Sequence, residues 1–325
     1  MSPPAAGSQA VLLATPSWRE QQTLARVLRT VASRVDVTTS MDEALARATD
    51  ARYALFLADL DLVLDKGAAH LDRIAALGPA TLLLGSANDY ARLGSLLEAD
   101  RVSFFISRNA VLAEEVVVTT SKLLSQDLFG VEKYLTWGAR THHATLRDTS
   151  ARAQMVDEIA AYSAGLGVDT RVVTMIRTVT DELIMNAIFN APVDEQGRHS
   201  WAELDRTEDR PLEGRHAVDV RYACDGSLLA VSVEDHFGSL ERATIAEYLG
   251  RCFQGAENRV EDQGAGAGLG IYMAFERVRQ LVFNIAPGAR TEAIGVVELD
   301  EQAFRSRERP RSFHVFRLRG QEGRP

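Results

Sequence analysis

Four glycines at alternate positions, Gly264, Gly266, Gly268 and Gly270, are the most concentrated chemical signal in this chain. Glycine has no side chain to bury and readily adopts positive φ, so the run predicts a loop rather than a helix or a strand. An apolar run with helical spacing, residues 271–281, follows at once. Because the N–H groups at a helix N-terminus favour an anion, the pattern predicts a phosphate-binding loop.

Two polar residues interrupt the apolar stripe of a helix that is expected to begin near Asp169. Glu182 and Asn186 are four residues apart, which places them one turn apart on the inward side of this helix. A buried carboxylate and a buried amide both cost free energy without hydrogen-bond partners. Either the protein or a ligand must satisfy them, unless they form an ordinary polar edge of an amphipathic helix. The stripe itself consists of Val172, Met175, Ile176, Val179, Leu183 and Ala187.

A third acidic residue ends a predicted strand. Two alternating runs, 217–223 and 228–233, are joined by Asp225-Gly226, which is a hairpin signature. The second run leads directly into Asp235, and Gly238 follows three residues later. Further strands are expected at 281–286, 291–299 and 313–318.

This order of features resembles the ATP-binding domain shared by gyrase, MutL, histidine kinases and anti-sigma-factor serine kinases, which is called GHKL. Residues 182–187 match its N box, Asp235 with Gly238 its first glycine box, and residues 264–270 its second. The resemblance covers roughly residues 145–320. It implies a C-terminal α/β sandwich of the GHKL (Bergerat) type that binds ATP and Mg²⁺.

The resemblance gives each of these residues a role. Asn186 would be the ligand of the Mg²⁺ ion that bridges the phosphates, and Asp235 would accept a hydrogen bond from the adenine amino group. Glu182 would be the catalytic base. The other nucleotide-binding positions that it implies are Gly238, Gly264, Gly266, Gly268, Leu269, Gly270 and Thr291.

The chain departs from the family at the first glycine box. The family pattern is Asp-x-Gly-x-Gly, whereas Phe237 and Ser239 occupy the two glycine places here and Gly238 lies between them. We therefore expect a reshaped adenine end of the pocket. No dimerisation helix precedes the two helices that lead into the N box, and Asn190-Ala191 stands where anti-sigma serine kinases often have His-Ala. The resemblance is closest to that branch.

The first half of the chain alternates apolar runs with helical segments. Runs that are apolar on both faces are typical of a parallel sheet covered on both sides. Five such alternations within about 125 residues predict a flavodoxin-like, doubly wound parallel sheet. The expected strands are residues 10–14, 35–39, 53–58, 80–84 and 102–106.

This layout resembles the receiver domain of response regulators, in which the third strand ends in a phosphoacceptor aspartate. Asp59 stands at that place. The expected first strand ends in Ala14-Thr15-Pro16, without the acids that hold Mg²⁺ in receivers, and Ser107-Arg108 replaces the lysine expected after the fifth strand. Phosphoryl transfer to a carboxylate needs a metal and a fixed cation. The domain is therefore interpreted as a pseudo-receiver, and phosphorylation of Asp59 is the alternative. Asp61 and Asp65 lie nearby and are candidate metal ligands.

Residues 129–148 show no clear period, and we interpret them as a linker between a receiver-like domain at 1–128 and a GHKL ATP-binding domain at 149–325. His142-His143 lies in this segment. A phosphoacceptor histidine needs a long dimerising helix, which is missing around this pair. We therefore expect two solvated linker residues.

The composition is that of an ordinary globular protein, with 46% hydrophobic and 25% charged residues. A net charge of −9 gives no basic surface for nucleic acid. Two cysteines without metal-type spacing fit a reducing compartment. The apolar runs are too short for a membrane span, and the start of the chain lacks a signal pattern. We expect a cytoplasmic protein that binds neither membranes nor nucleic acids.

Two functions are compatible with these features. The first is a signal-transduction kinase that phosphorylates a serine of a regulatory partner protein, with Glu182 as the base. The second is a non-catalytic, anti-sigma-like module that sequesters its partner when ATP orders a lid at residues 249–263. A homodimer is left open.

Overall fold

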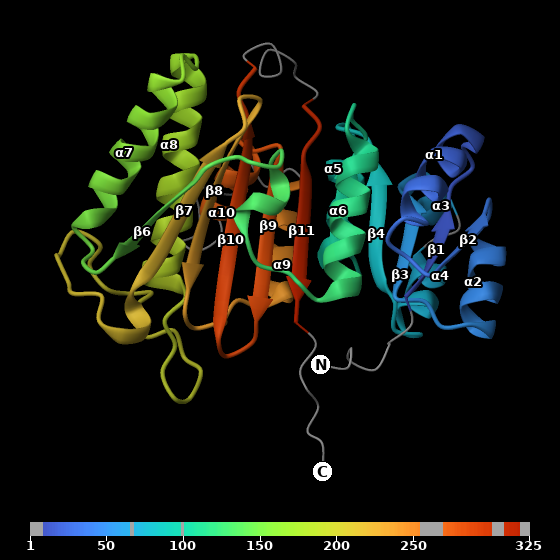
Figure 1. Ribbon diagram of the computed structural model, residues 1–325. Coiled ribbons are helices and arrows are strands. Elements are labelled where there is room, and N and C mark those ends of the chain that lie inside the picture. The colour runs from blue at the N-terminus through green and yellow to red at the C-terminus, as the bar shows by residue number, and fades with distance from the viewer. Residues whose placement is uncertain (1–8, 66–67, 99–100, 254–268, 301–308, 319–325) are drawn as a thin grey trace, which may run out of the picture. The chain divides into compact units, whose positions relative to one another are not determined.

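The structure is a computed structural model that describes residues 9–65, 68–98, 101–253, 269–300 and 309–318 (Figure 1). The chain divides into two compact units, Met1–Leu128 and Phe129–Pro325. Both units combine strands with helices.

The strands of the first unit are all parallel and follow the order β2-β1-β3-β4-β5. This is the flavodoxin-like order, so the expected receiver-like layout is confirmed. The strands are β1 (Ala10–Ala14), β2 (Arg34–Thr38), β3 (Leu55–Asp59), β4 (Ala80–Gly85) and β5 (Phe104–Ser107).

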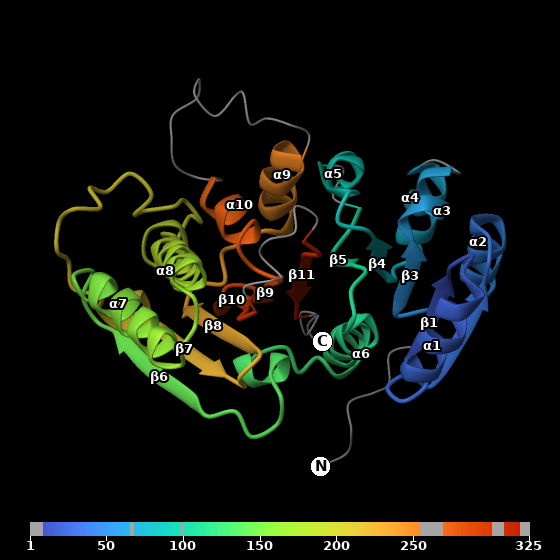
Figure 2. The ribbon, with the colours of Figure 1, turned by 90° about the horizontal axis from the view of Figure 1, so that it is seen from above.

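Helices cover both faces of this sheet, which is why its central strands are mostly apolar. Every residue of β1 and β3 is buried. Figure 2 shows α1 and α6 on one face and α3, α4 and α5 on the other. The helices are α1 (Trp18–Leu28), α2 (Met41–Asp50), α3 (Leu60–Asp65), α4 (Ala68–Ala75), α5 (Tyr90–Glu98) and α6 (Leu112–Ser125).

The second unit is built on a mixed sheet in the order β11-β9-β10-β8-β7-β6. The β11–β9 pair is parallel and the other pairs are antiparallel. The predicted Asp225-Gly226 hairpin joins β7 and β8, with Gly226 at φ +94°. The strands are β6 (Thr141–Leu146), β7 (Val218–Cys224), β8 (Leu228–Asp235), β9 (Gln280–Ala286), β10 (Arg290–Glu298) and β11 (Ser312–Arg317).

Helices α8 and α10 lie against each other on one face of this sheet (Figure 2). The predicted apolar stripe of α8 is buried at Val172, Ile176, Val179 and Leu183. Asp169 caps this helix by accepting a hydrogen bond from the N–H of Arg171 at 2.7 Å. The helices are α7 (Ala151–Gly165), α8 (Thr170–Met185), the π-helix η2 (Asn186–Asn190), α9 (Arg242–Phe253) and α10 (Leu269–Phe275), with short 3-10 turns η1 (Val131–Tyr134) and η3 (Gly214–His216).

Residues 141–146, which we interpreted as part of a linker, instead form strand β6 of this sheet. β6 pairs along its length with β7. His142 stacks on the Tyr222 ring at 4.8 Å, and His143 Nε2 lies 3.1 Å from Asp219 Oδ1. The Gly130 N–H donates to the fully buried Glu292 at 3.0 Å. Ser232 and Asn284 also donate to Glu292, so the start of the expected linker is fixed to β10.

Two other expectations change in the second unit. α10 ends at Phe275, and Leu281 and Val282 belong to β9, so the helical run after the glycines is shorter than expected. Residues 249–253, expected to start a mobile lid, are the last turn of α9, and Leu249 is fully buried. Within the described part of the chain, no helix is both long and apolar enough to cross a bilayer.

Candidate functional site

A cavity of about 170 Å³ opens in the second unit, on the face of the sheet that carries α8 and α10. Its walls are largely apolar and include Leu183, Val233 and Ile271. Three predicted site residues line it as well: Asn186 from η2, Asp235 from the end of β8 and Thr291 from the start of β10. An apolar cavity with a few convergent polar groups is the usual form of a small-molecule site.

Asn186 stands at the point where α8 becomes a π-helix. Its Oδ1 accepts a hydrogen bond from Asn190 Nδ2 at 2.7 Å, and both residues line the cavity. A carbonyl oxygen has two lone pairs, so this oxygen can still accept a second partner. Single π-helical turns often occur at functional sites.

Glu182 is half-buried one turn before Asn186, and the cavity lining does not extend to it. Burial and the neighbouring Asp181 raise the pKa of Glu182 above its ordinary value, whereas three arginines act against this shift. Gly270 lies directly beside it, because a Cβ on Gly270 would collide with Glu182 Oε2 and would lie 4.0 Å from Asn186 Nδ2. The end of the glycine run therefore meets the residues Glu182 and Asn186.

The other glycines of this box, Gly264, Gly266 and Gly268, lie outside the described residues. Leu269 and Gly270 form the start of α10, a helix of seven residues. The phosphate-binding loop stays a prediction.

Asp235 ends β8 with a side chain that is almost fully buried. Its Oδ1 accepts hydrogen bonds from the N–H groups of Phe237 at 2.8 Å and Gly238 at 3.2 Å. Burial raises the pKa of Asp235 to about 6, although these donors lower it. Thr291 stands directly opposite in the β8–β10 register, and its buried hydroxyl lies close enough to Asp235 to lower the pKa of that carboxyl, although it forms no hydrogen bond of ordinary geometry with the described residues. Two buried polar groups thus lie together at the cavity.

Gly238 fixes the turn after Asp235. It has φ +60°, and a Cβ there would collide with the carbonyl oxygen of Ala286 and lie 2.8 Å from the nitrogen of Ala289. Only glycine fits this position without strain. Phe237 is buried beside His216, with ring centres 5.1 Å apart, and Ser239 Oγ donates to the Ala191 carbonyl at 2.6 Å. Phe237 thus packs beside His216, and Ser239 attaches the turn to the residue that follows η2.

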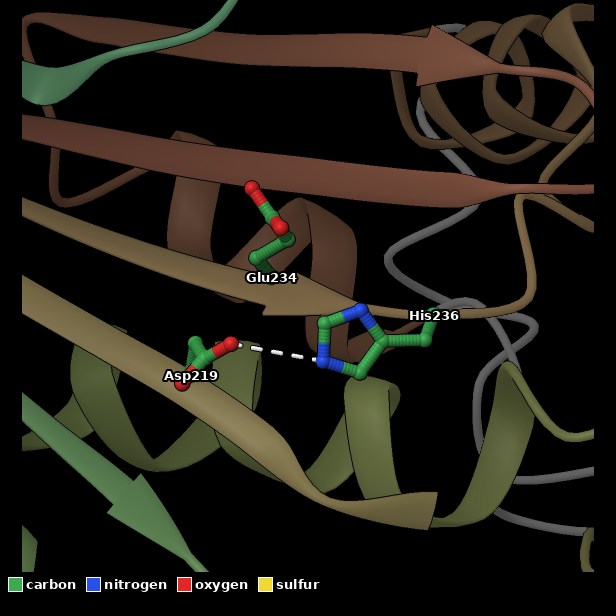
Figure 3. Close-up of side chains that lie close together, drawn as sticks. All are labelled: Asp219, Glu234 and His236. Atoms are coloured by element: carbon green, nitrogen blue, oxygen red, sulfur yellow. Dashed lines mark ion pairs between the residues drawn. The ribbon is translucent and has the colours of Figure 1, made fainter. Parts of the chain in front are cut away.

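The opposite face of the same strands carries Asp219, Glu234 and His236 (Figure 3). Their ligand atoms lie within 4.8 Å of one another, and their types suit a divalent metal. Glu234 already pairs with Arg290 at 3.2 Å and with Arg221 at 3.6 Å. Although burial acts to raise it, hydrogen bonds from Thr145 and His143 lower the pKa of Asp219. These existing partners account for both carboxylates, so the cluster is an ion-pair network that fixes β7 to β8.

In the first unit, Asp59 ends β3 at the expected phosphoacceptor place. Asp59 Oδ2 accepts a hydrogen bond from Arg108, and Oδ1 accepts the Asp61 N–H at 2.8 Å. Arg108 also pairs with Glu20 of α1, with Nε at 2.5 Å from Oε1. Although burial acts to lower it, hydrogen bonding to Glu20 and the charges of Glu20 and Asp59 raise the pKa of Arg108. The fixed cation that the sequence interpretation found missing is therefore present as an arginine.

Sequence reasoning missed Glu20, which supplies the second acid of this site from a helix. Its signal was weak, because an acidic residue three positions after the cap Ser17 is common in the first turn of a helix. Asp61 points to another partner, Arg92, whose NH2 lies 2.7 Å from Asp61 Oδ1.

Known proteins resemble this chain only weakly. The chain matches no model of a known protein family, and no curated protein matches it. Among solved structures it is similar to the chemotaxis response regulator CheY4 of Vibrio cholerae, with 18% identity over 36% of this chain and 100% of that chain, at a TM-score of 0.31. It is also similar to the response regulator LqsR of Legionella pneumophila, with 11% identity over 90% of this chain and 88% of that chain, at a TM-score of 0.30.

Proposed function

We propose that the second unit binds ATP with Mg²⁺ in the cavity between η2, β8 and β10, and that the protein acts in cytoplasmic signal transduction. One observation carries this proposal. Asn186, Asp235 and Thr291 come from three separate elements, and all three line a single apolar cavity. These are positions at which the GHKL resemblance expects a metal ligand, an acceptor for the adenine amino group and a further nucleotide-binding residue.

The chemistry of the cavity suits a nucleotide base. With a pKa of about 6, Asp235 is mostly ionised at pH 7 and accepts hydrogen bonds in an environment that excludes water. The adenine amino group is a donor that such a carboxylate would recognise, and the Thr291 hydroxyl offers a second polar contact. Leu183, Val233 and Ile271 provide apolar walls for the ring.

The phosphate end of the site would lie toward Asn186 and Gly270. Mg²⁺ usually takes one or two protein oxygens and completes its shell with phosphate oxygens and water. The Asn186 amide oxygen, which lines the cavity, fits this requirement. A bound Mg²⁺ ion would neutralise charge on the phosphates, and Asn186 would hold it there.

Phosphorylation of a regulatory partner protein is the activity that we favour. Glu182 lies one turn from Asn186 and beside Gly270, and its raised pKa brings the carboxyl closer to the pH at which a general base is efficient. The second candidate is a non-catalytic module that binds its partner when ATP is bound. It is favoured by the absence of Glu182 from the cavity lining, which includes its helix neighbours Leu183 and Asn186.

Nucleotide binding is tested by calorimetry on the wild type and Asn186→Ala, with ATP in the presence and absence of Mg²⁺. We expect the wild type to bind ATP more tightly with Mg²⁺ and the variant to lose most of that gain. Met185→Ala, next to Asn186 but not part of the cavity lining, serves as a control for disturbance of the helix. Equal ATP affinity for the wild type and Asn186→Ala in magnesium would refute the assignment of the metal ligand.

Catalysis is tested separately with Glu182→Ala. If Glu182 is a base, the variant keeps ATP binding while γ-phosphate transfer or release falls by roughly 10²–10⁴-fold. If the module is non-catalytic, neither protein shows turnover above a denatured sample. A loss of melting temperature without nucleotide would instead indicate a structural carboxylate.

A further inference from the structure

The segment between η2 and β7, residues 192–213, forms part of the rim of the cavity. It is attached to residues 147–149 at its far end, where the N–H of Leu212 donates to the Arg147 carbonyl at 2.8 Å. Near its middle, the Trp201 ring stacks on His216 at 4.3 Å. His199 and Ala202 of the segment line the cavity. These contacts hold a charged loop against the proposed nucleotide site.

Arg206 lies in the same segment, close to the N box. Its guanidinium carbon is 5.8 Å from the centre of the Phe189 ring, and Phe189 belongs to the π-helix that also carries Asn186. Arg206 is also close enough to Glu182 to lower the pKa of that carboxyl, as are Arg277 and Arg152. The geometry thus places a guanidinium group beside the end of the site that Asn186 and Gly270 define.

The three arginines around Glu182 differ in their hydrogen-bond and ion-pair partners. Arg152 forms an ion pair with Asp181 at 2.8 Å, and Arg277 donates to the Met273 carbonyl at 2.8 Å. Among the residues that the structure describes, Arg206 has no carboxylate within ion-pair distance, and its side chain is exposed. Within the described chain it is therefore the arginine of the three that forms neither an ion pair nor a hydrogen bond, so all of its N–H donors are available to a ligand.

We propose that Arg206 binds the phosphate chain of the nucleotide, so that segment 192–213 lets the site distinguish a triphosphate from an uncharged nucleoside. This inference rests on the proposed function. A guanidinium group offers paired N–H donors that match phosphate oxygens, and it keeps its charge at any physiological pH. It also offsets the negative charge of Glu182, which would otherwise repel the phosphates.

Calorimetry with ATP and with adenosine on the wild type, Arg206→Ala and Arg206→Lys tests the proposal. We expect Arg206→Ala to bind ATP roughly tenfold more weakly and adenosine as tightly as the wild type. Arg206→Lys should keep part of the ATP affinity, because a lysine retains the charge but not the paired donors. Arg198→Ala is the matched control, since Arg198 lies in the same segment but pairs with Asp194 at 2.8 Å.

The outcomes separate this proposal from the one it rests on. A wild type that binds ATP, together with an Arg206→Ala variant of equal ATP affinity, would overturn the role of Arg206 and leave the nucleotide site intact. An equal loss for ATP and adenosine would also overturn it, because Arg206 would then act on the shape of the cavity. A wild type that binds neither ligand would overturn both proposals.

Discussion

Each unit carries a buried aspartate at the end of a strand, but the two carboxylates have opposite surroundings. Asp59 in the first unit is neutralised by Arg108, which Glu20 also holds in place. Asp235 in the second unit has no cation paired with it among the described residues: backbone N–H groups donate to its Oδ1, and it lies at a cavity beside the hydroxyl of Thr291. In the first site the aspartate has a cationic partner within the protein. In the second site the burial of the aspartate costs free energy, and a ligand with a hydrogen-bond donor would lower that cost.

The largest effect is expected when the ion pair of the first unit is broken. Arg108→Met should lower the free energy of unfolding by about 3 kcal/mol, because Asp59 would be left buried without its cation. Thermal and urea unfolding measure this loss. Arg92→Met is the control, since Arg92 pairs with Asp61 and Asp89 but is more exposed. An Arg108→Met protein as stable as the wild type would show that the pair is not needed to compensate Asp59.

Stability should depend on pH through Asp235. Its pKa is raised from the ordinary 3.8 to about 6, so its neutral form is favoured in the folded state and stability falls as the pH rises from about 4 through 6. The loss is about 2–3 kcal/mol, at about 1.4 kcal/mol for each pH unit between the two values. Asp235→Asn should remove this dependence, because its amide oxygen still accepts from Phe237 and Gly238. Urea unfolding at pH 4.5 and 7.5 measures this change in stability. Equal pH dependence of stability in the wild type and Asp235→Asn would contradict the prediction.

The same substitution should weaken nucleotide binding while it stabilises the protein at neutral pH. Asp235→Asn is expected to cost roughly 1–3 kcal/mol of affinity for ATP, because an acceptor for the adenine amino group is lost. Calorimetry at pH 7.5 checks this. GTP carries a carbonyl oxygen where ATP carries the amino group, so equal affinity of the wild type for ATP and GTP would argue against this role of Asp235.

The smallest effect is expected from Asp59→Asn. Both oxygens of Asp59 already have partners, so the substitution should leave nucleotide affinity and partner binding unchanged. It should also make no difference to labelling by acetyl phosphate, because neither protein should form a stable phosphoryl adduct. An adduct on the wild type that is lost in Asp59→Asn would show that the first unit is a working receiver.

Local patterns predicted most of the fold. The apolar runs of β1, β3 and β4 and the buried stripe of α8 could be located from periodicity, because residues that share a face recur at fixed spacing. β6 could not, because its edge position leaves one side without a partner strand and its sequence is short and polar. The attachment of the residues before β6 also depends on Glu292, which is 162 residues away from Gly130.

The sequence by itself determined the order of the residues that could bind a ligand or take part in catalysis. These are an acid and an amide on one helix, an aspartate at a strand end, and glycines before a second helix. Only the tertiary structure decided which of them have partners. Arg108 and Glu20 are 88 residues apart, and their pairing follows from the way the parallel strands and α1 pack, which no local spacing encodes. Likewise, β8 and β10 place Thr291 opposite Asp235 because antiparallel register aligns residues across the sheet whatever their separation along the chain.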